Sequence, residues 1–376
     1  MPLEDDASAV TADRPVGVGI VGLGARDGWA ARAHVPALRA LPGVELRGLV
    51  GSSEASARTA AAAHGVPAFG SVAELAAAPD VDLVVVAVKV PRHRELVLPA
   101  LRAGVPVLSE WPLAVDLREA EELEGAARGT PTFVGLQGRL LPVFRWLAEL
   151  VRDGYVGRVL STTIVAASLG WGDPTSERFR YTLDRDNGAT LLTIAFGHVI
   201  DAVSSVLGEL DELSATTATL RPEVPHVETG GLVPMTAEDQ IAVHGVLRGG
   251  AILSAHHRGG AAQAGFSMVV EGTEGRLEVT APDHPHVNPV TVRGARGRDP
   301  LAPMALPEGR DAFADRAGTP AHALLHTYAA VRDDLRDGTA VAPGFADAVR
   351  RHRLLDAIQR SAAAGRRVRV EATQGT

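Results

Sequence analysis

Residues 16–28 read VGVGIVGLGARDG, and the order of apolar residues and glycines in them indicates the architecture of the first half of the chain. The stretch opens with a continuous apolar run rich in β-branched side chains, which predicts a buried strand. Glycines at positions 22, 24 and 28 predict a tight turn. Helical spacing of apolar residues over 29–41 predicts a helix next. Strand, glycine turn and helix in this order are typical of a parallel α/β sheet.

The same order repeats along the following residues. The predicted strands are residues 44–50, 81–88 and 105–109, and the predicted helices are residues 53–64 and 92–103. The run at 81–88 is apolar throughout, as expected for a strand buried on both faces of a parallel sheet. Alternating strands and helices imply right-handed crossovers, so we expect a doubly wound domain over residues 15–135.

Beyond residue 135 the pattern changes to period-2 alternation mixed with helices. The predicted strands are residues 159–167, 240–247, 251–257, 267–271 and 276–280, and the predicted helices are residues 141–152, 190–207, 320–337 and 345–364. We expect a second, α+β domain over residues 136–376, built on an open, mostly antiparallel sheet. Residues 1–14 are polar and unpatterned and predict a flexible tail.

Composition limits the possible functions. A chain of 376 residues with 46% hydrophobic and 22% charged residues favours a soluble protein of two domains. The net charge of -8 without a basic block argues against a nucleic-acid partner. No signal peptide or bilayer-spanning run is visible, so we expect a cytoplasmic protein without a membrane partner. The absence of cysteine excludes disulfides and thiolate sites.

The glycine turn stands where a dinucleotide pyrophosphate binds, between a strand and the N-terminus of a helix. Asp27 occupies the place of the third glycine in the strict pattern, and Gly28 comes one residue later. A turn that serves only the fold is the alternative. The predicted cofactor contacts of this segment are Gly22, Gly24, Ala25, Arg26, Gly28 and Trp29.

The end of the second predicted strand bears on the choice of cofactor. An acidic residue there would hold the ribose 2'-hydroxyl of NAD, but the chain continues with Gly51, Ser52 and Ser53. These serines, with Arg58 and Arg26 near, leave room for a 2'-phosphate. We therefore expect NADP slightly more than NAD, with ordinary polar loop residues as the alternative.

Three longer stretches identify a family resemblance. Residues 19–38 (GIVGLGARDGWAARAHVPAL), 107–127 (VLSEWPLAVDLREAEELEGAA) and 196–201 (FGHVID) resemble the Gfo/Idh/MocA family, the group of glucose-fructose oxidoreductase and inositol dehydrogenase. The resemblance covers roughly residues 14–370. It implies a Rossmann nucleotide domain, and a second domain whose open sheet carries the substrate and forms dimers or tetramers. It also implies hydride transfer between NAD(P) and a sugar or cyclitol carbon.

Two departures from the family pattern put catalysis in question. The family usually has Glu-Lys-Pro where this chain has Glu110, Trp111 and Pro112, and its lysine contacts substrate and cofactor. The family also commonly has an aspartate four residues before its histidine, where Ile194 precedes His198. With SLGWGDP, RYTLDRDNGATLL and LQGR, these changes resemble the fungal galactose-regulon repressor, a non-enzymatic relative that binds NADP and a protein partner.

The candidate catalytic residues are His198, Lys89 and Tyr181. Imidazole titrates near neutrality and the family counterpart of His198 faces the substrate; the alternative is a buried histidine held by Asp201. Lys89, the only lysine of the chain, follows the apolar strand 81–88 at the sheet edge where ligands bind. It could carry a proton, contact a cofactor or substrate, or have an exposed or salt-bridged role. Tyr181 lies in a segment expected to reach the cofactor, with an ordinary loop role as the alternative.

The remaining predicted cofactor contacts follow the later strands of the first domain. They are Val88, His93, Glu110, Trp111, Pro112 and Gln137. For His93 a capping role in local structure is the alternative, and for Trp111 it is packing between the domains rather than stacking on a ligand.

No metal site is expected. His256 and His257 are neighbours on a predicted strand and point to opposite faces. Asp283, His284 and His286 lack a further partner. We expect an NAD(P)-dependent oxidoreductase that acts on a small-molecule substrate, a sugar-like or other cyclic or polyhydroxylated alcohol or ketone. The alternative is a non-catalytic NADP-binding sensor that resembles the galactose repressor.

Overall fold

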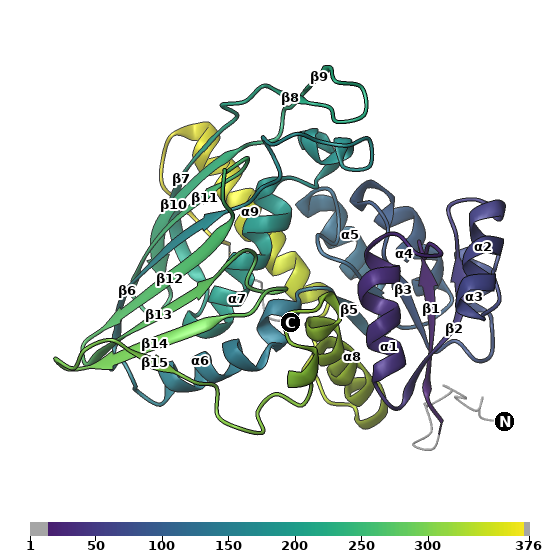
Figure 1. The fold of residues 1–376 in the computed structure, drawn as a ribbon, viewed down its shortest axis with the longest axis horizontal. Coiled ribbons are helices and arrows are strands. Elements are labelled where there is room, and N and C mark those ends of the chain that lie inside the picture. The colour runs from purple at the N-terminus through teal and green to yellow at the C-terminus, as the bar shows by residue number, and fades with distance from the viewer. Residues whose placement is uncertain (1–13, 372–376) are drawn as a thin grey trace.

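The computed structural model describes residues 14–371 of the chain. Within these residues the strands form a five-stranded sheet, a nine-stranded sheet and a two-stranded hairpin. Figure 1 shows the smaller sheet with its helices beside the large curved sheet, and α8 and α9 between the two. The predicted tail, apart from Arg14, lies outside the described residues.

The smaller sheet is parallel in every pairing, with the order β2-β1-β3-β4-β5. Its strands are β1 (Val16–Val21), β2 (Val44–Val50), β3 (Leu83–Val86), β4 (Val107–Ser109) and β5 (Thr132–Val134). The predicted doubly wound sheet is therefore confirmed. The chain builds outward from β1 to β2 and then returns to the other side of β1. This reversal opens a crevice at the carboxyl ends of β1 and β3, the usual ligand site of such sheets.

The helices that cover this sheet begin at side-chain caps or short turns. They are α1 (Val35–Ala40), which continues a π-helical turn at Ala30–His34, α2 (Glu54–His64), α3 (Val72–Ala76), α4 (His93–Arg102) and α5 (Leu117–Ala126). Ser53, Ser71 and Asp116 accept a bond from a backbone N–H in the first turn of α2, α3 and α5. Such caps satisfy amide groups that the helix itself leaves unpaired.

The larger sheet has the order β15-β14-β13-β12-β6-β11-β10-β7-β16. Its strands are β6 (Val159–Ala167), β7 (Leu210–Ala218), β10 (Gln240–Leu247), β11 (Ile252–Arg258), β12 (Gly265–Gly272), β13 (Gly275–Ala281), β14 (Thr291–Arg296), β15 (Ala302–Met304) and β16 (Val368–Arg369). Neighbouring strands run antiparallel, except that β6 and β11 are parallel. The predicted mostly antiparallel sheet is confirmed.

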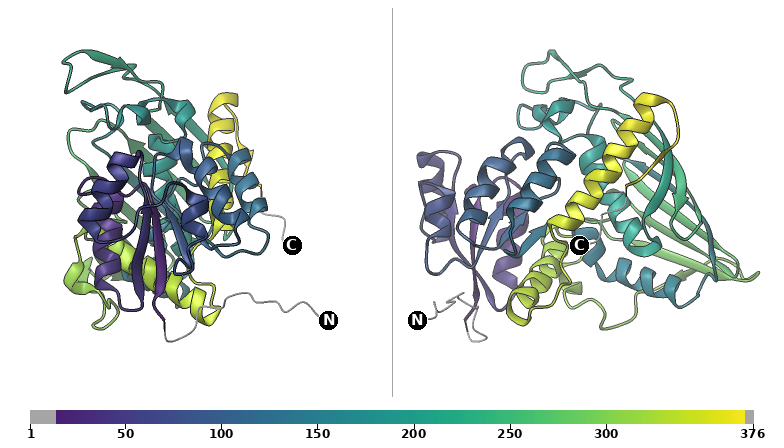
Figure 2. Two further views of the ribbon diagram at one scale, coloured as in Figure 1. Left: turned by 90° about the vertical axis from the view of Figure 1, so that its right-hand side faces the viewer. Right: turned by 180° about the vertical axis from the view of Figure 1, so that it is seen from behind.

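Strict alternation along β11 shows how this sheet is layered: residues from Ile252 to Arg258 are exposed and buried in turn. The buried face packs against helices, and the other face is open. The helices of this half are α6 (Pro142–Arg152), α7 (Gly197–Leu207), α8 (Pro320–Asp337) and α9 (Phe345–Ala364). The hairpin strands are β8 (Glu223–Pro225) and β9 (Leu232–Pro234). Figure 2 shows α9 running along the inner side of the large sheet.

Helix α8 comes late in the chain but packs into the core of the parallel sheet. Leu324, Leu325 and Tyr328 are fully buried in the same apolar cluster as Val18 and Ile20 of β1. The domain division near residue 135 stays a prediction, because α8 contributes to the first core from the far end of the chain. None of the helices in the described part of the chain combines the length and hydropathy of a bilayer-spanning segment.

Candidate active site

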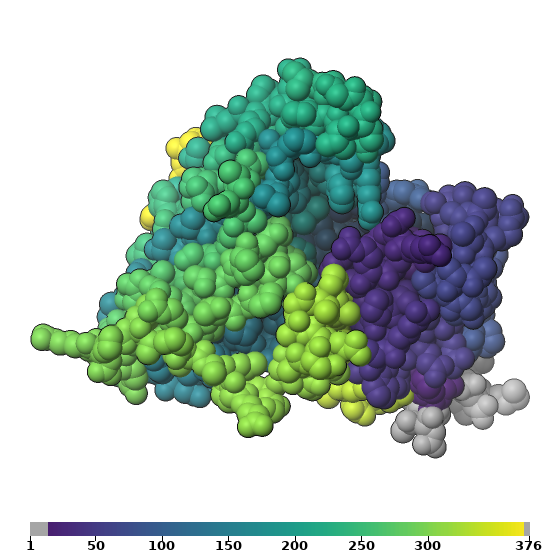
Figure 3. Space-filling view, in the orientation of Figure 1, coloured from purple at the N-terminus to yellow at the C-terminus, as the bar shows by residue number. Residues whose placement is uncertain are grey.

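Two predicted catalytic residues meet across the space between the two sheets. The ammonium nitrogen of Lys89, just past β3, lies 4.6 Å from the ring centroid of Tyr181. Tyr181 belongs to a 3-10 turn at Arg180–Leu183, on the side of the larger sheet. Figure 3 shows a hollow between the purple N-terminal segment and the teal segment that overhangs it. Lys89 is exposed and Tyr181 is half-buried.

The glycine turn has the close approaches that its sequence predicts. Gly22 has φ +92°, and a Cβ there would lie 2.6 Å from both the Ala87 carbonyl oxygen and Val88. A Cβ on Gly24 would lie 2.8 Å from the carbonyl oxygen of Asp27. Only glycine fits these two positions, so the turn stays tight although Asp27 replaces the third glycine.

An arginine of the larger domain faces this turn. A Cβ on Gly28 would lie 3.9 Å from Nη2 of Arg178, which comes just before the turn that carries Tyr181. Arg178 was not predicted from the sequence. The cationic RFRY stretch at residues 178–181 is the signal that could have indicated it, because a guanidinium is a common phosphate contact.

The end of β2 opens onto a second cavity of about 680 Å³. Ser52, Ser53, Arg58 and Arg92 are among its lining residues. Arg58 is paired with Glu54, and Arg92 with Glu95 at 2.6 Å, so both guanidinium groups already have carboxylate partners. Ser53 caps α2 through its hydroxyl. Of the residues predicted to lie near the ribose, Ser52, Ser53 and Arg58 line this one cavity and Arg26 does not.

A buried hydrogen-bond chain ends at Glu110, just past β4. Oε1 of Glu110 lies 2.9 Å from Nε2 of His34, and Nδ1 of His34 lies 2.7 Å from the Tyr328 hydroxyl. Nε2 of Gln137 donates to the other oxygen of Glu110 at 3.4 Å. A carboxylate accepts from the Nε2–H of His34, which leaves Nδ1 to accept from Tyr328. Burial raises the pKa of Tyr328 well above its ordinary value, so this hydroxyl keeps its proton.

The side chains of Trp111 and His93 are held by contacts within the protein. Trp111 is 5% exposed, and its indole N–H donates to the Thr193 carbonyl at 2.8 Å. The ring lies under Gly197, at the interface between the domains. His93 is buried between the carbonyls of Val88 (3.1 Å) and Leu113 (3.3 Å), so it fastens two loops together. These contacts match the alternatives named for both residues, and contact of either residue with a cofactor stays a prediction.

Four histidines gather where α7, β11 and the loop after β13 meet. This histidine cluster consists of His198, His257, His284 and His286. The rings of His198 and His286 stack with centroids 3.9 Å apart and an interplanar angle of 15°. The hydroxyl of Ser168 lies 2.9 Å from Nε2 of His257 and 3.5 Å from Nε2 of His284. The structure thus brings His284 and His286 to the predicted catalytic His198.

Burial keeps the histidine cluster uncharged. It lowers the pKa of His198 to about 4 and that of His257 to about 3. The pKa values of His284 and His286 are also lowered by burial. Asp201 does not hold His198 as the alternative supposed, because its carboxylate binds the guanidinium groups of Arg139 and Arg351. At neutral pH His198 is therefore a neutral imidazole, and it has no imidazolium proton to donate.

The other predicted contacts lie on the same side of the parallel sheet. Ala25 is half-buried and Arg26 exposed on the glycine turn, and Pro112 follows Trp111 into the interface. Trp29 packs edge-on against His34 with ring centroids 6.5 Å apart. Its indole nitrogen is buried and has no hydrogen-bond partner among residues 14–371.

Both halves of the chain resemble known proteins. Residues 16–136 match the model of the oxidoreductase family with an NAD-binding Rossmann fold, and residues 142–281 match that of the Gal80p C-terminal domain. The galactose/lactose metabolism regulatory protein GAL80 of Saccharomyces cerevisiae is 30% identical over 298 residues, 72% of this chain and 68% of that protein. The chain belongs to the Gfo/Idh/MocA oxidoreductase family. Its resemblance to the galactose repressor is confirmed as well.

Other proteins similar to this chain carry dehydrogenase or reductase names. Dehydrogenase aclE of Aspergillus oryzae is 42% identical over 189 residues, 48% of this chain and 50% of that protein, so the chain matches only half of its length. The 1,5-anhydro-D-fructose reductase of Ensifer adhaerens is 30% identical over 243 residues, 63% of this chain and 69% of that protein. A super-repressor mutant of Saccharomyces cerevisiae Gal80p shares the fold, with a TM-score of 0.83, 24% identity, and coverage of 95% of this chain and 98% of that one.

Proposed function

We propose that this family member is an NAD(P)-dependent oxidoreductase that reduces or oxidises a cyclic, polyhydroxylated ketone or alcohol. The contact between Lys89 and Tyr181 carries the proposal, because it places an ionisable pair at the carboxyl end of β3, beside the glycine turn. Proton transfer must accompany hydride transfer at an alcohol carbon.

The chain's own residues fit a dinucleotide. The tight turn at Gly22 and Gly24 leaves its backbone free to approach a pyrophosphate, and Arg178 faces the turn with a positive charge. The cavity at Ser52 and Ser53 suits the adenosine half. The unpartnered indole N–H of Trp29 offers a further donor. The bound nicotinamide supplies or accepts the hydride. Because the end of β2 carries serines rather than an acid, we propose NADP ahead of NAD.

Tyr181 is the preferred proton donor in the direction of reduction. Burial raises the pKa of Tyr181, so the phenol is intact at neutral pH. When its proton passes to a carbonyl oxygen, the phenolate left behind is stabilised by the ammonium group of Lys89. His198, also a candidate catalytic residue, is less suited to donate a proton because its pKa of about 4 leaves it uncharged. It is suited instead to accept a hydrogen bond from a substrate hydroxyl.

A ring with several hydroxyl groups is the substrate class that this site favours. Neutral imidazoles each offer one donor and one acceptor, and the hydroxyl of Ser168 offers both. The histidine cluster and Ser168 therefore match the hydrogen-bonding pattern of a sugar, in keeping with the name of the reductase relative. These neutral side chains would bind the sugar without placing a net charge beside it.

A regulator that does not catalyse is the second candidate, and Trp111 favours it. The residue that replaces the lysine of the family's Glu-Lys-Pro motif is buried under Gly197 and bonded to Thr193, so it supplies no proton. A regulator would bind the dinucleotide and change its affinity for a protein partner.

Turnover with matched tyrosine variants separates the two functions. Oxidation of NADPH and NADH by the purified protein is measured against a panel of keto-sugars and cyclic ketones. We expect Tyr181→Phe to lower kcat by about 10²-fold with little change in KM, as for loss of a general acid. Tyr155→Phe, which alters a tyrosine near β14 that touches Gly294, should keep full activity. Nucleotide binding without turnover on any substrate would reject the enzyme and favour the regulator.

A further inference from the structure

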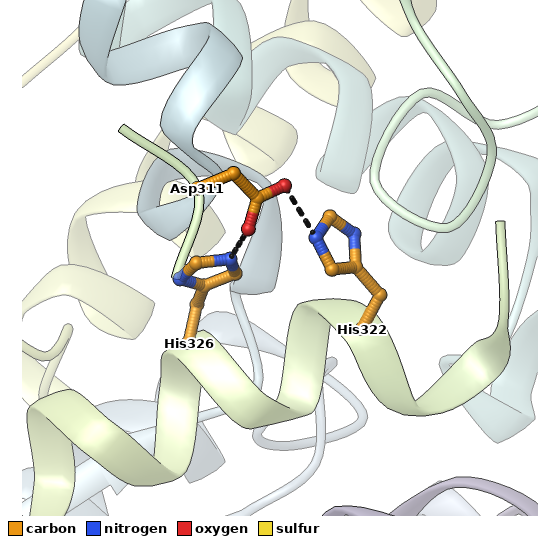
Figure 4. A group of neighbouring side chains, drawn as sticks. All are labelled: Asp311, His322 and His326. Carbon is orange, nitrogen blue, oxygen red and sulfur yellow. Dashed lines mark hydrogen bonds and ion pairs between the residues drawn. The ribbon is translucent and has the colours of Figure 1, made fainter. Parts of the chain in front are cut away.

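A second group of chemically active side chains lies away from the cleft, on α8. His322 and His326 are four residues apart on this helix and present their rings on one face, and Asp311 approaches from the preceding loop (Figure 4). Two histidines at this spacing on a helix are a frequent basis for binding a metal ion. The pair was not predicted from the sequence, although the HALLH stretch at residues 322–326 contains it.

The three side chains converge through the atoms that metals bind. Nε2 of His322 lies 2.9 Å from one oxygen of Asp311, and Nε2 of His326 lies 3.0 Å from the other. All three donor atoms fit within 4.8 Å of one another. A tetrahedral zinc ion with bonds of about 2.0–2.1 Å places its ligand atoms about 3.3 Å apart, so small side-chain movements suffice.

The surroundings hold this arrangement in place. The side chains of His322, His326 and Asp311 are 16%, 12% and 14% exposed. The backbone N–H of Phe313 donates to Asp311 at 2.9 Å. The ring of Phe313 packs edge-on against His326, with centroids 4.9 Å apart. Ligands fixed by such neighbours lose little conformational freedom when they bind an ion.

One side of the group faces open space. Asp311 and His322 line a cavity of about 420 Å³ whose wall also includes His286 of the histidine cluster. Three protein ligands with space beside them match a zinc ion whose fourth position is filled by water or a small ligand. The cavity therefore connects this group to the back of the candidate active site.

We propose that Asp311, His322 and His326 bind a divalent transition-metal ion, with Zn²⁺ as the preferred ion. Two imidazole nitrogens with one carboxylate oxygen suit zinc better than magnesium or calcium, which prefer oxygen ligands. The ion replaces the protons on Nε2 of His322 and of His326, which in its absence form the hydrogen bonds to the Asp311 carboxylate. It ties the loop before α8 to the helix that carries Tyr328, the end of the hydrogen-bond chain from Glu110.

Metal titration of the full-length protein tests the proposal. The protein is freed of metal with a chelator, and Zn²⁺ is titrated in competition with a chromophoric indicator. We expect one tight equivalent per chain and a higher Tm after binding, because an ion that binds only the folded state stabilises it. Co²⁺ should give the visible absorption of a tetrahedral site.

Matched variants assign the site. His322→Ala and Asp311→Asn should each weaken Zn²⁺ binding at least about 10-fold. Even the loss of a residue that only hydrogen-bonds to a metal ligand has an effect of this size, and these two residues would be ligands themselves. His244→Ala, an exposed histidine of β10, should bind as the parent does. Circular dichroism and the metal-free Tm establish that each variant is folded.

Three outcomes would overturn the proposal. The first is no stoichiometric binding by the parent protein. The second is unchanged affinity in folded His322→Ala or Asp311→Asn protein. The third is loss of the tight equivalent in His284→Ala but not in His322→Ala, which would place the ion in the histidine cluster.

Discussion

Arg178 shows how a residue of one domain can serve a ligand held by the other. It belongs to the segment before Tyr181, yet its guanidinium faces Gly28 of the glycine turn. A cation at this place can pair with a pyrophosphate by charge-assisted hydrogen bonds. Its role would therefore concern binding of the dinucleotide rather than proton transfer.

Replacing Arg178 should weaken nucleotide binding without unfolding the protein. We expect Arg178→Gln to raise the Kd for NADPH by about 10-fold, since one hydrogen bond to a charged group contributes about 1.5–3 kcal/mol. Arg180→Gln is the matched control, because Arg180 is exposed and pairs with Glu177 at 3.6 Å. Nucleotide fluorescence titration measures both. Equal losses in the two variants would show that the effect is only one of net charge.

The histidine cluster makes stability depend on pH in one direction. Burial lowers the pKa of His198 from 6.5 to about 4, so the unfolded chain takes up a proton that the folded protein refuses. This contribution to stability is full above the unfolded pKa, and it is lost as pH falls from about 6.5 toward 4. For His198 alone it amounts to about 3 kcal/mol, at about 1.4 kcal/mol for each unit of pKa.

Urea unfolding at several pH values measures this dependence. The free energy of unfolding should fall steeply between pH 7 and pH 5 in the parent protein. It should fall less steeply in His198→Gln, which has no imidazole to protonate. His244→Gln, at an exposed position, should keep the parent slope. A parent protein whose stability is flat across this range would contradict the buried, neutral histidines.

Lys89 and Tyr181 could each be predicted from the sequence as candidate site residues, but the contact between them could not. Lys89 was predicted from its place at the end of a strand. Tyr181 was predicted from its place in a segment expected to reach the cofactor. Their meeting required the arrangement of the two domains, which no local pattern encodes. The packing of Trp111 could not be predicted for the same reason, because the residue that makes room for its ring is Gly197, far along the chain.

At the scale of elements, a glycine at its first position lets helix α7 pack closely against Trp111. A Cβ on Gly197, the first residue of α7, would lie 2.7 Å from the indole nitrogen of Trp111. The helix thus approaches Trp111 more closely than any side chain would permit. This contact also positions His198, the next residue in the chain.

Two glycine-to-alanine changes in helices should therefore have opposite signs. Gly197→Ala should destabilise the protein by about 1–3 kcal/mol, the usual cost of overpacking. Gly125→Ala in α5, where a Cβ would meet nothing within 4 Å, should stabilise it by about 0.5–1 kcal/mol through lower chain entropy. Chemical denaturation of both variants checks the prediction. Destabilisation of similar size in both variants would mean that the contact with Trp111 is not the cause.

Most long elements could be predicted from periodicity, and the short ones could not. The structure has α2, α6, α8 and α9 within a residue of their predicted bounds, because each combines helical spacing with a clear end. Helix α5, LREAEELEGA, was missed, although Asp116 caps its start and Leu117, Ala120 and Leu123 recur at helical spacing among its many charged residues. Strands β14 to β16 lie near one edge or the other of the large sheet and owe their pairing to neighbouring strands rather than to their own composition.

At the scale of the whole molecule, the open face of the large sheet offers a surface for self-association. Val165 of β6 and Ile252 of β11 are 42% and 53% exposed, on adjacent strands. Exposed apolar side chains on a broad sheet face favour contact with another protein surface. We propose that two chains associate through this face.

Charge on that face should separate the chains. We expect Val165→Glu and Ile252→Glu to shift the protein from dimer to monomer in sedimentation velocity at micromolar concentration. Leu220→Glu, 70% exposed in the loop after β7, should leave the dimer intact. A parent protein that is monomeric at every concentration would contradict the proposed interface.

The placement of α8 also limits how this protein can be taken apart. A gene fragment that ends after β5 would encode the parallel sheet but leave its core open where Leu324, Leu325 and Tyr328 belong. Such a fragment would expose an apolar surface and aggregate. A chimera that exchanges nucleotide specificity with a relative must therefore carry two separate pieces of sequence, the first 135 residues and the helix from Pro320 to Asp337. The domain predicted to bind the cofactor is thus encoded by two separate parts of the gene.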